Sequence, residues 1–183
     1  MSTTTTDARL TGARRGVDRL RVIVDAGAAE IVPAIRRHLD ALEREEASVR
    51  AAVLDAPDEV EPRIGLLSTR LDIAWASLTA DVSDDWATFA SAVEEELAGW
   101  EMYLERLQVN IASGPWDART EAEAALADVR TRLIEVDARL EQARHAGPDG
   151  SQGERTRVTA DRHALERQAN ELFAKVNRKE QET

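Results

Sequence analysis

The chain has 183 residues and a formal net charge of −11, and 43% of its residues are hydrophobic but only 4% are aromatic. This length fits one domain, and a composition led by Ala, Glu, Arg and Leu is typical of long helices. Cysteine is absent, which excludes disulfides and thiolate metal sites, and the acidic balance opposes sequence-independent binding to nucleic acid.

Residues 1–6 begin the chain with small polar side chains, and we expect them to be disordered. No positively charged stretch followed by an apolar one is present, so we predict no secretory signal. No apolar run approaches the roughly 20 residues needed to span a bilayer. The expected compartment is therefore the cytoplasm.

A single helix is predicted over residues 7–54, because apolar residues recur there at steps of three and four, the period of one helical face. This first seam consists of Leu10, Ala13, Val17, Leu20, Val24, Ala28, Ile31, Ile35, Leu39, Leu42, Glu46, Val49 and Val53. Pro33 removes a helical hydrogen bond, and Gly27 weakens the same region. We expect a kink near residues 27–33, with a full break as the alternative.

A second long helix is predicted over residues 59–112. Its seam is apolar throughout and consists of Ile64, Leu67, Leu71, Trp75, Leu78, Val82, Trp86, Phe89, Val93, Leu97, Trp100, Leu104, Leu107 and Ile111. The segment Ser83-Asp84-Asp85 resembles a helix start, but the seam keeps its phase across it, so we predict one continuous helix. The short connection before residue 59 and the eleven-residue spacings in both seams favour two straight helices packed antiparallel.

Two shorter helices are predicted over residues 115–145 and 152–180, joined by a flexible linker over residues 147–153. They are too short to cover the long pair from end to end. The predicted fold class is therefore all-α: two long antiparallel helices with a shorter helical hairpin packed on one end. This single domain over residues 7–183 has a four-helix bundle section and a two-helix coiled-coil stalk over about residues 35–82. Most of the aromatic side chains fall in the four-helix section, where more space must be filled.

The charge of the chain is concentrated in its middle. Residues 51–116 contain 13 acidic and 3 basic side chains, a net charge of −10. We expect arginines from the first and last helices to lie beside the acidic flanks of the helix over residues 59–112, where such charges select partner and orientation.

No catalytic, cofactor-binding or metal site is predicted. His38, His145 and His163 are the only histidines, and none has a glutamate three residues before it, as di-iron helical bundles require. A surface or capping role is expected for each. The acidic run Glu94-Glu95-Glu96 is typical of a solvated helix face. No phosphate-binding loop or nucleophile elbow is present, so an enzyme is not expected.

Two polar residues, Glu46 and Arg162, stand at apolar seam positions. They lie either at exposed ends of their seams or inside them, where a single polar residue sets helix register. Gly12 and Gly16 have the spacing of a close helix contact, which is a weak signal outside a membrane.

The sequence favours a non-enzymatic structural or protein–protein interaction protein, acting through self-association or a helical partner. Its candidate interaction surface lies on the predicted stalk and consists of Leu39, Leu42, Leu71, Trp75, Leu78 and Val82. The alternative is a peripheral membrane protein that binds through the arginine-containing helix over residues 7–54. Nucleic acid is an improbable partner, and we expect no cofactor and no small-molecule substrate.

Overall fold

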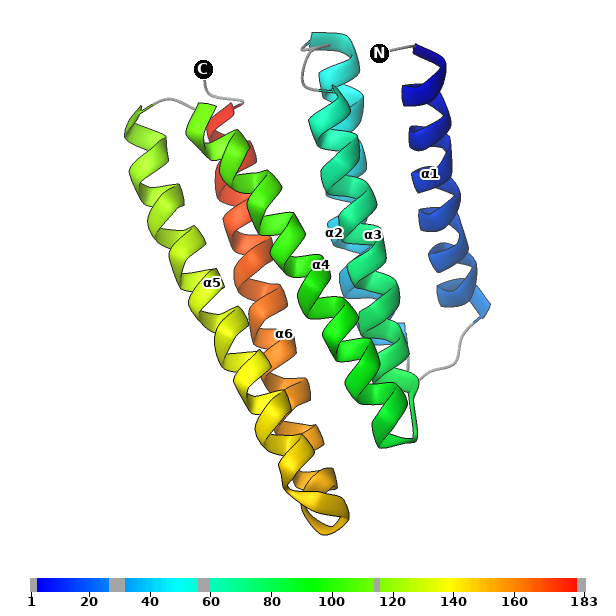
Figure 1. The fold of residues 1–183 in the computed structure, drawn as a ribbon. Coiled ribbons are helices and arrows are strands. Elements are labelled where there is room, and N and C mark those ends of the chain that lie inside the picture. Colours follow the sequence, from blue (N-terminus) through cyan, green and yellow to red (C-terminus); the bar gives the residue numbers. More distant parts are fainter. Residues whose placement is uncertain (1–2, 27–31, 56–59, 114–115, 181–183) are drawn as a thin grey trace.

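The computed structural model describes residues 3–26, 32–55, 60–113 and 116–180 (Figure 1). Side chains are described over residues 8–22, 36–53, 60–112, 119–146 and 152–176. The described residues are helical apart from residues 83–85 and 146, which confirms the all-α class. The helices are α1 (Thr3–Ala26), α2 (Val32–Asp55), α3 (Val60–Val82), α4 (Trp86–Ser113), α5 (Trp116–His145) and α6 (Gly147–Glu180).

Consecutive helices run antiparallel, so the six described helices alternate in direction along the chain (Figure 1). Each helix packs on the next one along the chain, and α1 also packs on α3. Two expected irregular segments are helical in their described parts. Helix α1 begins at Thr3, inside the segment predicted to be disordered, and α6 begins at Gly147, inside the predicted linker, where Pro148 occupies the first turn, a position that suits proline.

The single helix predicted over residues 7–54 is wrong, because the chain forms two antiparallel helices there. Arg21 on α1 lies with its Nη2 3.0 Å from Glu43 Oε1 on α2, a contact that one straight helix forbids. The kink expected near residues 27–33 is therefore wrong, and the antiparallel directions of α1 and α2 agree with the alternative, a full break; residues 27–31 themselves lie outside the described residues. The seam keeps its phase on both sides of this segment because α1 and α2 both turn their apolar faces towards α3.

The continuous helix predicted over residues 59–112 is also wrong, because α3 ends at Val82 and α4 begins at Trp86. Asp85 caps α4, with its Oδ1 accepting a hydrogen bond of 2.8 Å from the backbone N–H of Thr88. Arg155 on α6 donates to the carbonyl oxygens of Ser83 and Asp84 beyond the end of α3. A new helix therefore begins where the capping signal predicts one, although the apolar seam continues across the break.

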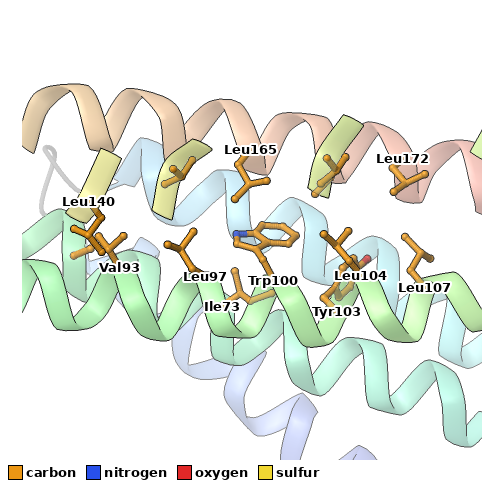
Figure 2. Close-up of a cluster of buried hydrophobic side chains, with 14 of the residues drawn as sticks. Ile73, Val93, Leu97, Trp100, Tyr103, Leu104, Leu107, Leu140, Leu165 and Leu172 are labelled. Carbon is orange, nitrogen blue, oxygen red and sulfur yellow. The ribbon is translucent and has the colours of Figure 1, made fainter. Parts of the chain in front are cut away.

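Two groups of buried apolar side chains hold the helices together. The main core lies between α3, α4, α5 and α6 and includes Phe89. Figure 2 shows Trp100 and Tyr103 of the same core beside leucines of α4 and α6. The α1–α2–α3 core is smaller, and its buried members are Ala13, Val17, Leu20, Leu42, Val49, Ile64, Leu67, Ala74 and Leu78. Helix α3 contributes to both cores and is the centre of the molecule.

The predicted two-helix stalk differs from the observed arrangement. Helix α2 reaches α4 through a hydrogen bond between Tyr103 and Glu45, and α3 reaches α6 through one between Arg70 and Asn170. Each predicted long helix is replaced by two shorter antiparallel helices. The segment expected to project from the bundle as a stalk therefore lies against the other helices (Figure 1).

Candidate functional site

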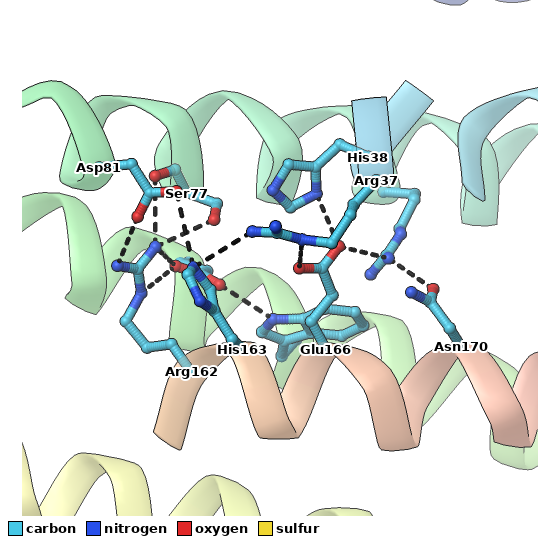
Figure 3. Close-up of polar contacts among 11 residues, drawn as sticks. Arg37, His38, Ser77, Asp81, Arg162, His163, Glu166 and Asn170 are labelled. Carbon is cyan, nitrogen blue, oxygen red and sulfur yellow. Dashed lines mark hydrogen bonds and ion pairs between the residues drawn. The ribbon is translucent and has the colours of Figure 1, made fainter. Parts of the chain in front are cut away.

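A layer of polar side chains is buried between α2, α3, α4 and α6 (Figure 3). Burying an ion costs several kcal/mol unless a partner compensates, so such a layer requires close pairing. The buried polar layer consists of His38, Glu45, Arg70, Ser77, Glu96, Arg162 and Glu166. It contains side chains from all four helices, and its members pair across helices.

Arg162 on α6 is fully buried and is the most completely paired member of the layer. Its Nε and Nη2 each lie 2.6 Å from Glu96 Oε2 on α4, and its Nη1 lies 3.2 Å from Asp81 Oδ1 on α3. Its Nη2 also donates to Ser77 Oγ at 2.9 Å. Burial raises the pKa of Asp81, but His163 and Arg162 outweigh it and bring that pKa below its ordinary value. Arg162 therefore joins α6 to both α3 and α4.

Glu166 on α6 faces three basic side chains. His38 Nδ1 lies 3.0 Å and Arg70 Nη2 3.5 Å from its Oε1, and Arg37 Nε lies 4.0 Å from its Oε2. Burial alone would raise the pKa of Glu166, but His38, Arg70 and Arg37 together lower it to about 2. Glu166 thereby stays ionised and connects α2 and α3 to α6.

Arg70 on α3 is held by an aromatic ring as well as by polar atoms. Its Cζ lies 4.3 Å from the ring centroid of Trp100, and its Nη2 donates to Asn170 Oδ1 at 2.6 Å. Its Nε and Nη1 have no hydrogen-bond partner among the described residues. The ring face of Trp100 offsets part of that deficit, because a desolvated cation–π contact stabilises by about 2 kcal/mol.

Glu45 on α2 is also buried, but fewer polar and charged groups stabilise its carboxylate than stabilise that of Glu166. Tyr103 Oη donates a hydrogen bond of 2.8 Å to its Oε1, while its Oε2 has no partner among the described residues. Burial raises the pKa of Glu45 to about 7, against the opposing effects of Arg70 and Tyr103. A cavity of about 10 Å³, room for one water molecule, lies beside Glu45 between Ser48, Arg63, Leu66, Leu107, Asn110, Phe173 and Val176.

The chemistry of the buried polar layer is that of helix docking. Catalytic side chains must reach a substrate, whereas His38, Arg162 and Glu166 are at most 2% exposed and are enclosed by four helices. The cavity beside Glu45 is too small for an organic ligand. The layer therefore fixes which helices lie side by side and in which register.

The histidines divide between buried and exposed positions. His145 lies exposed at the end of α5, as expected. The surface or capping role expected for His38 is wrong, since it is 2% exposed and faces Glu166. His163 is partly buried, with Nε2 3.6 Å from Asp81 Oδ2. Sequence spacing missed His38 because its partner is on α6, far away in the chain.

The polar seam residues are buried, and so is one residue of the acidic run. Glu46 and Arg162 are both buried, so the expectation that they lie at exposed seam ends is wrong and a register role is favoured. Glu94 and Glu95 are exposed, as expected of a solvated face, but Glu96 is buried against Arg162. The expected pairing of arginines with the acidic middle of the chain is confirmed by Arg162 on Glu96 and by Arg9 on Glu61.

The predicted interaction surface lies under α1. Leu42 and Leu78 are buried in the α1–α2–α3 core, and Leu39, Leu71 and Trp75 are partly buried against it. We call these five residues the α1 contact surface. Val82, the sixth predicted residue, is 46% exposed at the end of α3.

Helix α1 meets this surface through a close contact and through ion pairs. A Cβ atom at Gly16 would overlap Leu71 Cδ2, whereas one at Gly12 would meet nothing within 4 Å. Arg14 Nε lies 3.3 Å from Glu46 Oε1, and Arg21 pairs with Glu43. Arg14 and Arg21 of α1 are thus directed towards acidic side chains of their own chain.

No family model, curated protein or solved structure matches this chain. Among the described residues, no helix has the length and apolar composition needed to cross a membrane. Within the same ranges, no group of three or more His, Asp or Glu side chains is arranged to hold a metal ion. The α1 contact surface and the buried polar layer are the features from which a function can be inferred.

Proposed function

We propose that this chain is a cytoplasmic, non-enzymatic interaction protein whose α1 contact surface binds a helix, with α1 occupying that surface in the free chain. The observation that supports this most directly is the limited attachment of α1. It packs mainly on α2 and α3, and none of its described side chains belongs to the main core. A helical partner that displaces α1 would find an apolar surface already shaped for a helix.

The energy that holds α1 is small enough for displacement. Among its described side chains, the buried apolar ones are Ala13, Val17 and Leu20. Burying a Val or Leu side chain stabilises by about 1.5–3 kcal/mol, so the three together contribute about 5 kcal/mol. The surrounding ion pairs are partly exposed and add little. A free energy of about 5 kcal/mol corresponds to a Kd on the order of 0.2 mM.

The chemistry of the partner helix follows from the contacts of α1. The helix is expected to present a small residue opposite Leu71, because a Cβ there would overlap Leu71 Cδ2 unless the Leu71 side chain shifts. It must also carry basic side chains that reach Glu43 and Glu46. The expected partner is therefore an amphipathic helix with small apolar residues on one face and arginines beside them.

A peptide of residues 3–26 is expected to bind the full chain carrying Gly16→Leu, with a Kd on the order of 0.2 mM. The substitution places a side chain against Leu71 and displaces the chain's own α1, which leaves the surface open. Fluorescence anisotropy of a labelled peptide measures binding, and circular dichroism verifies that the remaining helices are folded. The wild-type chain should bind at least about tenfold more weakly, because its tethered α1 competes at an effective millimolar concentration.

Matched control peptides separate this surface from non-specific binding. The peptide carrying Gly12→Leu should bind like the native peptide, since a side chain at Gly12 meets no neighbour. The peptide carrying Gly16→Leu should not bind. Equal binding of the two variant peptides, or no binding of the native peptide up to about 1 mM, would contradict the proposal.

Binding to a membrane surface is the second candidate. Arg15 and Arg19 are exposed on α1 and have no ion-pair partner among the described residues, which favours it. Arg9, Arg14 and Arg21 are engaged with carboxylates, which opposes it because interfacial helices need a free basic face. We expect no flotation of the wild-type chain with anionic liposomes at low salt, and salt-sensitive flotation that is lost in the Arg15→Gln/Arg19→Gln variant would favour the membrane instead.

A further inference from the structure

The helix that best satisfies the α1 contact surface is α1 itself, and a second copy of the chain can supply it. We propose that two copies exchange α1, so that each α1 lies on the α2 and α3 of the other copy. This inference rests on the proposed function, because it names the partner of the same surface. It requires that α1 can leave, that the rest of the chain stays folded, and that the exchanged contacts match the original ones.

The rest of the chain does not depend on α1 for its core. The main core is built from α3, α4, α5 and α6. Helix α2 has its own attachments to α4 and α6, through Glu45 on Tyr103 and His38 on Glu166. Detaching α1 would thus leave five helices connected by the main core and the buried polar layer.

The sequence permits α1 and α2 to lie in one line. The first seam continues at steps of three and four from Leu20 to Leu39 across the five residues that separate the two helices. A helix that keeps one apolar face over this length satisfies the pattern of a continuous helix. Gly27 and Pro33 favour the hairpin in a single copy, and a kink accommodates Pro33 in the extended form.

Two extended copies reproduce the contacts of the hairpin. In the hairpin, α1 lies antiparallel to α2, with Arg21 beside Glu43 and Arg14 beside Glu46. When two in-line copies lie antiparallel about a twofold axis, each α1 lies beside the other copy's α2 in that same relation. The contacts are the same in number and kind, so the balance between the two forms depends on protein concentration and on the cost of placing Gly27 and Pro33 inside an extended helix.

Cross-linking between two different copies tests the exchange, since the chain contains no cysteine of its own. One full-length copy carries Arg21→Cys, and a second, tagged copy carries Glu43→Cys. After mixing and refolding together, a short bismaleimide is expected to join the two copies, with a yield that rises with concentration and is detectable by about 100 µM. Both positions are partly exposed, so the substitutions leave the fold in place and the thiols accessible.

Two controls give every outcome a meaning. The chain carrying both cysteines should form the link within one copy, which verifies reactivity. The pair Arg21→Cys and Val109→Cys should form no link, because Val109 is exposed on α4, outside the α1–α2–α3 core. The exchange would be overturned if the doubly substituted chain forms the internal link but the 21–43 pair forms none between copies. This conclusion would hold even if light scattering detects a dimer. Binding of the peptide of residues 3–26 would still support the proposed function in that case.

Discussion

Replacing Arg162 with methionine is expected to lower the free energy of unfolding by about 3–5 kcal/mol. Methionine keeps most of the apolar stem but removes the guanidinium that pairs with Glu96 and Asp81. Glu96 is 1% exposed, so its carboxylate would stay buried without its partner. Urea unfolding followed by circular dichroism measures the loss, provided that the m value is unchanged.

The double variant Glu96→Leu/Arg162→Met distinguishes charge pairing from simple loss of packing. Replacing a buried ion pair with apolar side chains is often close to neutral, so the double variant should recover more than half of the loss. Arg157→Ala is the matched surface control, because Arg157 is an exposed arginine of α6 that pairs with Glu154, and its effect should stay within about 0.5 kcal/mol. A loss below about 1 kcal/mol in Arg162→Met would contradict the role assigned to the buried polar layer.

Replacing Glu45 with glutamine is expected to stabilise the chain above neutral pH and to change little near pH 4.5. Burial raises the pKa of Glu45 from 4.5 to about 7, so the folded chain binds a proton more tightly than the unfolded chain. Wild-type stability therefore decreases as pH rises from about 4.5 through 7, by about 3 kcal/mol in total. Glutamine accepts the same hydrogen bond from Tyr103 without carrying a charge.

The measurement is the free energy of unfolding of wild type and Glu45→Gln at several values between pH 4.5 and 8. The variant should gain up to about 3 kcal/mol over wild type at pH 8, and the difference should vanish near pH 4.5. Glu43→Gln on the same helix is the control, because Glu43 is exposed and its replacement should leave the pH dependence of the wild type in place. A constant difference between the two curves would show that Glu45 does not titrate in this range.

Glu166 behaves in the opposite way. Its pKa is lowered to about 2, so its contribution to stability is present above pH 4.5 and is lost as pH falls through 2. The two carboxylates differ because Glu166 faces two arginines and a histidine, whereas the hydrogen bond to Glu45 comes from the neutral hydroxyl of Tyr103. Both carboxylates are buried and both lie near Arg70, yet their pKa values shift in opposite directions. Burial alone therefore does not set the direction of the shift.

The all-α class could be predicted from the sequence, and so could the burial of Phe89, Trp100 and Tyr103 in a helical core. Periodicity alone does not predict the two helix breaks, because a row of apolar residues keeps its phase whenever both halves of a hairpin face the same core. At Ser83-Asp84-Asp85 the capping signal was present in the sequence, and the hydrogen bond from Thr88 to Asp85 shows that it determines the structure. Periodicity thus predicts which face of a helix is buried more reliably than it predicts where the helix ends.

The buried polar layer shows a different limit of the sequence. Glu46 and Arg162 could be identified because each interrupts an apolar seam, and both are buried. Glu45 and His38 lie outside the seam of α2 and would be exposed if that helix had one buried face. They are buried because α2 has partners on two sides, with α1 and α3 near Glu46 and α4 near Glu45. Only the arrangement of the other helices reveals the second buried face.

The pairing between early helices and α6 also has a consequence for the order of synthesis. Arg70 and Asn170 are 100 positions apart, and α6 is made after the other five described helices. Until α6 leaves the ribosome, Arg70 and Glu96 lack their partners on that helix and can remain hydrated. A nascent chain of α1 to α5 therefore presents charged side chains beside the apolar face on which α6 will dock. That hydration opposes premature aggregation during translation, which proceeds at about 5–20 residues per second.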